Sequence, residues 1–94
     1  MTDLRKIAFV VGTRPELIKL APAIRLARSR SDIVTTVIST GQHRELVLPL
    51  FDFFEIQPDY NLDVLSVAKT PSQVAAEILI RLPDVLNKTQ PDWL

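Results

Sequence analysis

The chain has 94 residues, of which 47% are hydrophobic, with 11 basic and 11 acidic side chains, one histidine and no cysteine. Balanced charge without a run of one sign predicts no nucleic-acid partner and no anionic-membrane partner. The lack of cysteine excludes disulfides and thiolate chemistry, and one histidine does not support a metal site. The apolar run from Ile7 to Val11 is too short to span a membrane, and no signal peptide precedes it, so we expect a cytoplasmic protein.

The first third of the chain predicts a strand followed by a helix. Ile7 to Val11 is continuously apolar and stops at Gly12, which is typical of a strand buried on both faces of a parallel sheet. The next residues match a capping box, with Thr13 placed to bond an early helix N–H and Glu16 placed to reach back. Apolar residues then mark one helical face: Leu17, Leu20, Ala21, Ile24 and Ala27. Pro22 should kink this helix or begin a second short one, and the pattern leaves both open.

The middle of the chain predicts a second strand and a second helix. The β-branched run from Ile33 to Ile38 indicates a strand, which ends at the turn-prone residues 39–41. A helix is expected from about Gln42 to Phe54, interrupted at Pro49, with its apolar face formed by Leu46, Leu50 and Phe53 or Phe54. Residues 58–61 predict a turn.

The last third predicts one more helix. Residues 61–67 alternate weakly and allow a short extended piece. Thr70, Pro71 and Gln73 repeat the capping signature, and apolar positions continue past Pro83, which should bend the helix: Val74, Ile78, Leu82 and Val85. Residues 91–94 then resemble the beginning of another buried strand.

This order predicts an α/β fold. We expect residues 1–94 to form an incomplete N-terminal Rossmann-like domain with the order β-α-β-α-α, ending where a third strand begins. Two strands and a fraction make a poor parallel sheet, so the chain is expected to be a piece of a longer protein.

Two polar turns could carry chemistry. Gly12 and Thr13 bring a helix N-terminus to the carboxyl end of a parallel strand, where Arg14 and Lys19 could help to bind phosphate. The alternative is that Thr13 only caps the helix while both cations lie in water. The turn lacks the later glycines of the dinucleotide fingerprint and the Lys-Ser/Thr pair of a P-loop, which disfavours nicotinamide cofactors and ATP hydrolysis.

The second turn contains Gln42 and His43, and it should face the same edge of the sheet as the first. His43 has the pKa range of a general acid or base, but a lone histidine at a helix start also serves as a hydrogen-bonding cap. No pair of acidic residues has the spacing for acid/base or metal chemistry, so no catalytic residue can be assigned within this chain.

Three ordered blocks resemble the non-hydrolysing UDP-N-acetylglucosamine 2-epimerases. They are Val11 to Glu16 with the following Ile18-Lys19 and Ala21-Pro22, Thr40 to Glu45, and Pro58 to Tyr60. The resemblance covers nearly the whole chain. It implies a GT-B type protein of two Rossmann-like domains, of which this chain is similar to the first quarter.

The resemblance also implies an activity. Members remove the C2 proton of UDP-GlcNAc, expel UDP to give a glycal, and re-add UDP to give UDP-ManNAc, an isomerase reaction of cell-surface polysaccharide biosynthesis. No NAD and no metal is required, and the full-length protein is expected to be a cytoplasmic homodimer. The catalytic carboxylates and a later histidine of the family lie beyond Leu94, so we expect the isolated chain to be inactive.

By position, Gly12, Thr13, Arg14 and Lys19 resemble residues of the nucleotide-sugar site. Gln42 and His43 resemble residues of a second, regulatory UDP-sugar site in bacterial members. Members with that site often carry an arginine on the third helix where this sequence has Glu77, which argues against a working regulatory site.

Other functions remain open at this point. A GT-B glycosyltransferase or a hydrolysing epimerase would share the fold and the UDP-sugar. The chain could also be a non-catalytic nucleotide-binding remnant.

Overall fold

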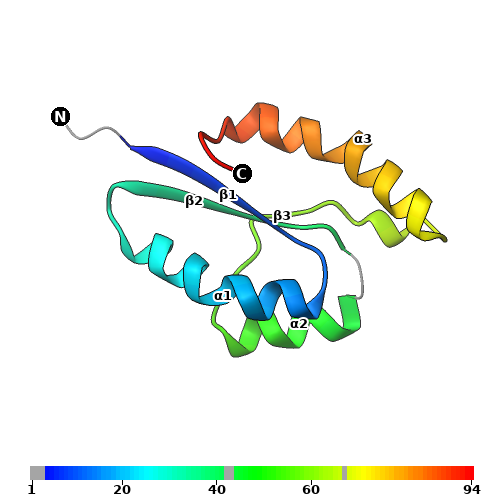
Figure 1. The fold of residues 1–94 in the computed structure, drawn as a ribbon, viewed down its shortest axis with the longest axis horizontal. Coiled ribbons are helices and arrows are strands. Elements are labelled where there is room, and N and C mark those ends of the chain that lie inside the picture. Colours follow the sequence, from blue (N-terminus) through cyan, green and yellow to red (C-terminus); the bar gives the residue numbers. More distant parts are fainter. Residues whose placement is uncertain (1–3, 42–43, 67) are drawn as a thin grey trace.

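The computed structural model describes residues 4–41, 44–66 and 68–94. Its elements follow in the order β1 (Arg5–Val11), α1 (Arg14–Ser29), β2 (Ile33–Ser39), α2 (Arg44–Phe53), β3 (Tyr60–Asn61), the 3-10 helix η1 (Val64–Ser66) and α3 (Pro71–Thr89). Within the described residues the strands form a parallel sheet in the order β1-β2-β3 (Figure 1). The structure therefore adds a short strand, β3, that the expected order β-α-β-α-α lacks.

Helices cover both faces of this sheet (Figure 1). One core lies beneath α1 and α2 and includes Val11, Leu17, Ala21, Ile24, Val37, Val47, Phe51 and Ile56. The other lies beneath α3 and includes Ala8, Ile38, Leu62, Val64 and Val85. Val37 and Ile38 are adjacent in β2 but belong to different cores, because side chains alternate across a strand. Burial on both faces explains why the first strand is continuously apolar.

The interior prolines do not divide the helices. α1 runs as one helix through Pro22, which excludes the second short helix, and α3 runs through Pro83. Each proline loses one backbone hydrogen bond, but the apolar faces on either side remain packed on the sheet. Pro49 likewise lies inside α2, where Val47 and Phe51 are the buried residues among the side chains that are described. The sequence pattern did not include these two residues. Of its own candidates, Leu50 and Phe54 pack against the core, Phe53 is 76% exposed, and the side chain of Leu46 lies outside the described part.

The two predicted capping boxes differ. Thr70 accepts a hydrogen bond from the Gln73 N–H (3.2 Å), and the Gln73 side chain accepts one from the Thr70 N–H (3.1 Å), which confirms this box. Thr13 makes no side-chain cap of α1. Its hydroxyl donates to the Glu16 carboxylate (2.9 Å), a hydrogen bond that is strengthened by the charge on the acceptor.

Residues 58–61, predicted as a turn, contain β3. Tyr60 and Asn61 pair in parallel with Ile38 and Ser39. The carboxylate of Asp59 accepts from the Val37 N–H (2.7 Å), so it joins the start of β3 to β2. Local composition could not reveal this pairing, because the partner residues lie more than 20 positions earlier in the chain.

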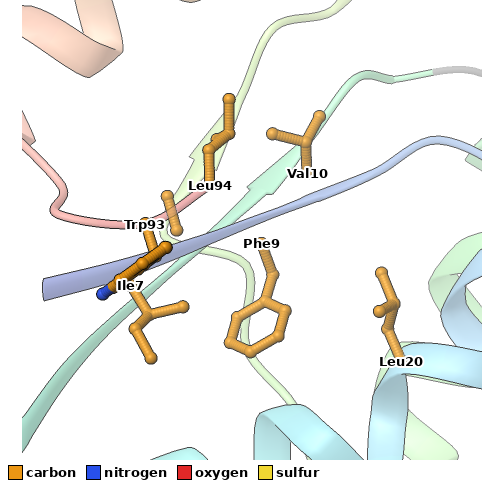
Figure 2. A pocket seen from close by; sticks show the side chains of 7 residues that line it. Ile7, Phe9, Val10, Leu20, Trp93 and Leu94 are labelled. Atoms are coloured by element: carbon orange, nitrogen blue, oxygen red, sulfur yellow. The ribbon is translucent and has the colours of Figure 1, made fainter.

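The other edge of the sheet contacts the end of the chain. Trp93 forms a parallel bridge with Ile7, and the Ala8 N–H donates to the Trp93 carbonyl (2.9 Å). Beside this bridge lies an apolar cavity of about 340 Å³, lined chiefly by Ile7, Phe9, Val10, Leu20, Trp93 and Leu94 (Figure 2). Trp93 and Leu94 remain 65% and 70% exposed, so this edge presents apolar surface.

Candidate functional site

The turn between β1 and α1 lies at the carboxyl end of the sheet. Gly12 is buried there, and Thr13 has an extended backbone at the N-cap of α1. The Glu16 carboxylate accepts hydrogen bonds from the Gly12 N–H (3.3 Å) and the Thr13 hydroxyl (2.9 Å). Both donors precede α1, so the Glu16 carboxylate lies beside the helix N-terminus, in keeping with the positive end of the helix dipole.

The two predicted cations lie together on the surface beside this turn. Arg14 and Lys19 are exposed and line an open cavity of about 520 Å³ with Pro15 and Ile18. The four residues share one side of the first helical turns because positions four apart are neighbours. Ile18 is 48% exposed and had no predicted role. Gly12 and Thr13 lie at the adjoining turn and do not line this cavity.

The second turn begins next to the first. The Thr40 N–H donates to the Val11 carbonyl (3.0 Å), which brings the ends of β1 and β2 side by side. Gly41 is buried with φ +86°, and a Cβ atom there would lie 2.7 Å from the Cα of Asp63. The position therefore requires glycine for both conformation and space. Gln42 and His43 lie outside the described residues.

This edge carries groups of the kind that can bind an anion. The N–H groups of the first turn of a helix have no partners within it, and Arg14 and Lys19 add two mobile cations close by. Among the described residues, no group of three or more His, Asp or Glu side chains is placed to hold a metal ion. The helices that the structure describes include none that could span a bilayer.

Two ion pairs in the structure were not predicted from the sequence. Arg28 donates to the carboxylate of Asp59 (3.0 Å) and to the Gln57 carbonyl (3.0 Å), so it is an anchor between α1 and β3. Glu77 pairs with Arg81 (3.0 Å) on α3. The spacing of four residues on a predicted helix was a signal for this second pair.

Comparisons with known proteins agree on one family. The family model for UDP-N-acetylglucosamine 2-epimerase matches residues 25–94. The UDP-N-acetylglucosamine 2-epimerase of Salmonella borreze is 40% identical over 88 residues, which is 94% of this chain and 23% of that protein. The enzyme of the same name from Campylobacter jejuni is 36% identical over 95% of this chain and 23% of its own length.

Solved structures give the same result. UDP-GlcNAc 2-epimerase from Neisseria meningitidis, bound to UDP-GlcNAc, superposes with a TM-score of 0.84 at 37% identity, over 93% of this chain and 24% of that chain. An S. aureus protein in complex with UDP gives a TM-score of 0.85 at 32% identity, over 95% of this chain and 23% of that chain.

The chain thus spans about a quarter of the length of these relatives, which are two-domain proteins of the GT-B type. The expected α/β class with a parallel sheet is confirmed. On the family match and the relatives' identities, the chain belongs to the UDP-N-acetylglucosamine 2-epimerase family.

Proposed function

We propose that this chain is the N-terminal part of an isomerase that interconverts UDP-GlcNAc and UDP-ManNAc by elimination and re-addition of UDP. Membership of the epimerase family supports this proposal, together with the polar edge formed by the β1–α1 turn. On this proposal residues 1–94 are the incomplete first Rossmann-like domain. The full-length protein is a cytoplasmic homodimer that supplies cell-surface polysaccharide biosynthesis.

The role proposed for this chain is to hold the nucleotide sugar. Gly12 and Thr13 shape the turn, the N-terminus of α1 attracts the diphosphate, and Arg14 and Lys19 bind its oxygens. The Arg14 guanidinium can form a forked contact with phosphate, while the Lys19 ammonium acts as a mobile point charge. The proton-transfer groups come from the rest of the protein. Gln42 and His43 are kept as candidates for a regulatory UDP-sugar site.

Turnover of UDP-GlcNAc by the full-length protein tests the reaction. Formation of UDP-ManNAc, with incorporation of one solvent deuterium at C2 in D₂O, is the expected result. Release of free ManNAc and UDP would instead identify a hydrolysing enzyme. Transfer of the sugar to an acceptor would identify a glycosyltransferase. The isolated chain should show none of these activities, since positioning groups cannot replace acid/base catalysis worth about 10² to 10⁴ in rate.

A further inference from the structure

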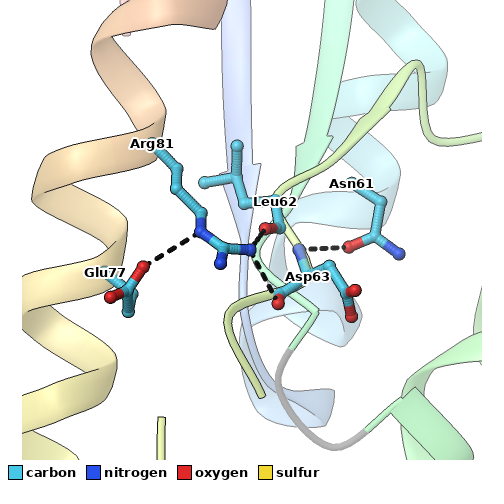
Figure 3. Close-up of polar contacts among 5 residues, drawn as sticks. All are labelled: Asn61, Leu62, Asp63, Glu77 and Arg81. Carbon is cyan, nitrogen blue, oxygen red and sulfur yellow. Dashed lines mark hydrogen bonds and ion pairs between the residues drawn. The ribbon is translucent and has the colours of Figure 1, made fainter. Parts of the chain in front are cut away.

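Arg81 joins α3 to the backbone that follows β3 (Figure 3). Its Nη1 donates to the carbonyls of Leu62 (2.6 Å) and Asp63 (2.9 Å), and its Nε donates to the Glu77 carboxylate (3.0 Å). The Arg81 and Glu77 side chains are only 31% and 26% exposed, so water screens these contacts less than it would at an open surface. Glu77 therefore orients a guanidinium whose other end holds two backbone carbonyls.

The segment that Arg81 holds lies against the end of β2. The Leu62 N–H donates to the Ser39 carbonyl (2.8 Å), and the Val64 N–H donates to the Thr40 carbonyl (3.0 Å). Between them, Asp63 has φ +54°, a conformation that non-glycine residues seldom adopt. The Asn61 side chain supports it by accepting from the Asp63 N–H (2.9 Å).

Gly41 connects the Asp63 backbone to the carboxyl edge of the sheet. The backbone of Asp63 packs so closely on Gly41 that a Cβ would lie 2.7 Å from the Asp63 Cα. Because Thr40, the preceding residue, bonds to the end of β1, Gly41 and Thr40 link the Asp63 backbone to the strand end that leads into the β1–α1 turn. In open α/β sheets, ligands bind at this carboxyl edge.

We propose that Arg81 is a positioning residue for nucleotide-sugar binding, acting through Leu62, Asp63 and Gly41. It does not touch the ligand. The proposal rests on the proposed function, because it assumes that the carboxyl edge binds the UDP moiety. A guanidinium is required because it donates from Nη1 to the two carbonyls and from Nε to Glu77 at the same time.

The test uses the full-length protein with Arg81→Ala, Arg81→Lys, Glu77→Gln and Gly41→Ala. Lys88→Ala is the matched control, since Lys88 is an exposed cation in the last turn of the same helix. Kd for UDP by calorimetry, KM and kcat for UDP-GlcNAc, and Tm are measured for each. Arg81→Ala should raise Kd and KM about tenfold, the size expected for lost hydrogen bonds to a charged group, with kcat changed less. Arg81→Lys and Glu77→Gln should be intermediate.

The decisive measurement is whether the effects of Arg81→Ala and Gly41→Ala on Kd are independent. Gly41→Ala should also raise Kd for UDP. The double variant Gly41→Ala/Arg81→Ala should have the same Kd as the single variant that binds UDP more weakly, because both changes displace the same Asp63 backbone. The positioning role would be overturned if Arg81→Ala lowered Tm but left Kd and KM unchanged. It would also be overturned if the increase in Kd in the double variant equalled the product of the two single-variant increases. If Arg81→Ala does not fold, Arg81→Lys and Gly41→Ala decide the question. Wild-type protein that neither binds UDP nor turns over UDP-GlcNAc would refute the proposed function itself.

Discussion

Arg14 and Arg25 are exposed arginines on one helix, and they differ in their distance from its N-terminus. Only Arg14 lies where the strand end and the helix N-terminus meet. In the full-length protein, Arg14→Ala should lower kcat/KM for UDP-GlcNAc about tenfold to a hundredfold, because a charge-assisted hydrogen bond contributes about 1.5 to 3 kcal/mol. Arg14→Lys should restore part of the loss, because an ammonium lacks the forked contact.

Arg25→Ala is the matched control for this measurement and should stay near wild type. Arg28 is a poorer control, because it bonds to Asp59 and Gln57 and its loss would also remove these structural contacts. Equal, small losses in Arg14→Ala and Arg25→Ala would mean that Arg14 is only a solvated residue near a helix end.

Glu16 stabilises the same turn from within. Its carboxylate accepts hydrogen bonds from the Gly12 N–H and the Thr13 hydroxyl at the positive end of α1. Glu16→Gln should therefore lower the free energy of unfolding by about 0.3 to 1 kcal/mol, since the amide can still accept one bond but carries no charge. Urea denaturation measures the change. Asp84→Asn, at an exposed site on α3 far from the helix N-terminus, should have a smaller effect, and an equal loss in both variants would contradict this role.

At the scale of elements, Asp59 joins α1, β2 and β3. Its carboxylate accepts hydrogen bonds from the half-buried Val37 N–H and from the Arg28 guanidinium. Asp59→Ala should cost about 1 to 3 kcal/mol, because the Val37 N–H loses its acceptor. Arg28→Ala should cost less, about 0 to 1 kcal/mol for the ion pair, whose side chains are 30% and 41% exposed.

Chemical denaturation of the full-length protein measures whether Asp59→Ala loses more stability than Arg28→Ala. Arg30→Ala, which breaks the more exposed pair with Asp32, should be nearly neutral and provides the control. Equal losses in Asp59→Ala and Arg28→Ala would show that the ion pair, and not the half-buried hydrogen bond from the Val37 N–H, holds β3 in place.

At the scale of the whole molecule, the outer edge of β1, which Asp92 and Trp93 cover in part, should govern the behaviour of the isolated chain. The apolar cavity beside Ile7 and Phe9 and the exposed Trp93 and Leu94 all lie along this edge. Unprotected strand edges with apolar side chains pair with other chains. The purified chain should therefore associate as its concentration rises, and light scattering coupled to size-exclusion chromatography measures this.

A double variant with Trp93→Lys and Leu94→Lys should associate less, since lysines at a strand edge oppose pairing between copies. The doubly substituted Leu79→Lys and Ile80→Lys chain is the control, because it removes exposed apolar residues from α3 instead. A wild-type chain that stays monomeric at high concentration would refute the prediction, as would equal loss of association in both variants.

Local interactions allowed much of this protein to be predicted from its sequence. The apolar run of β1 and the capping box at Thr70 depend on residues a few positions apart. The phosphate-binding role of the Gly12 turn stays a prediction. The order of the three blocks likewise indicated the epimerase family, which the comparisons confirmed.

Only the tertiary structure decided the contacts between distant parts of the chain. β3 exists because Asp59 and Tyr60 find partners in β2, and Arg81 finds its carbonyls 18 and 19 residues away. Such choices depend on which groups packing brings within hydrogen-bond distance, and no local pattern along the chain contains that information.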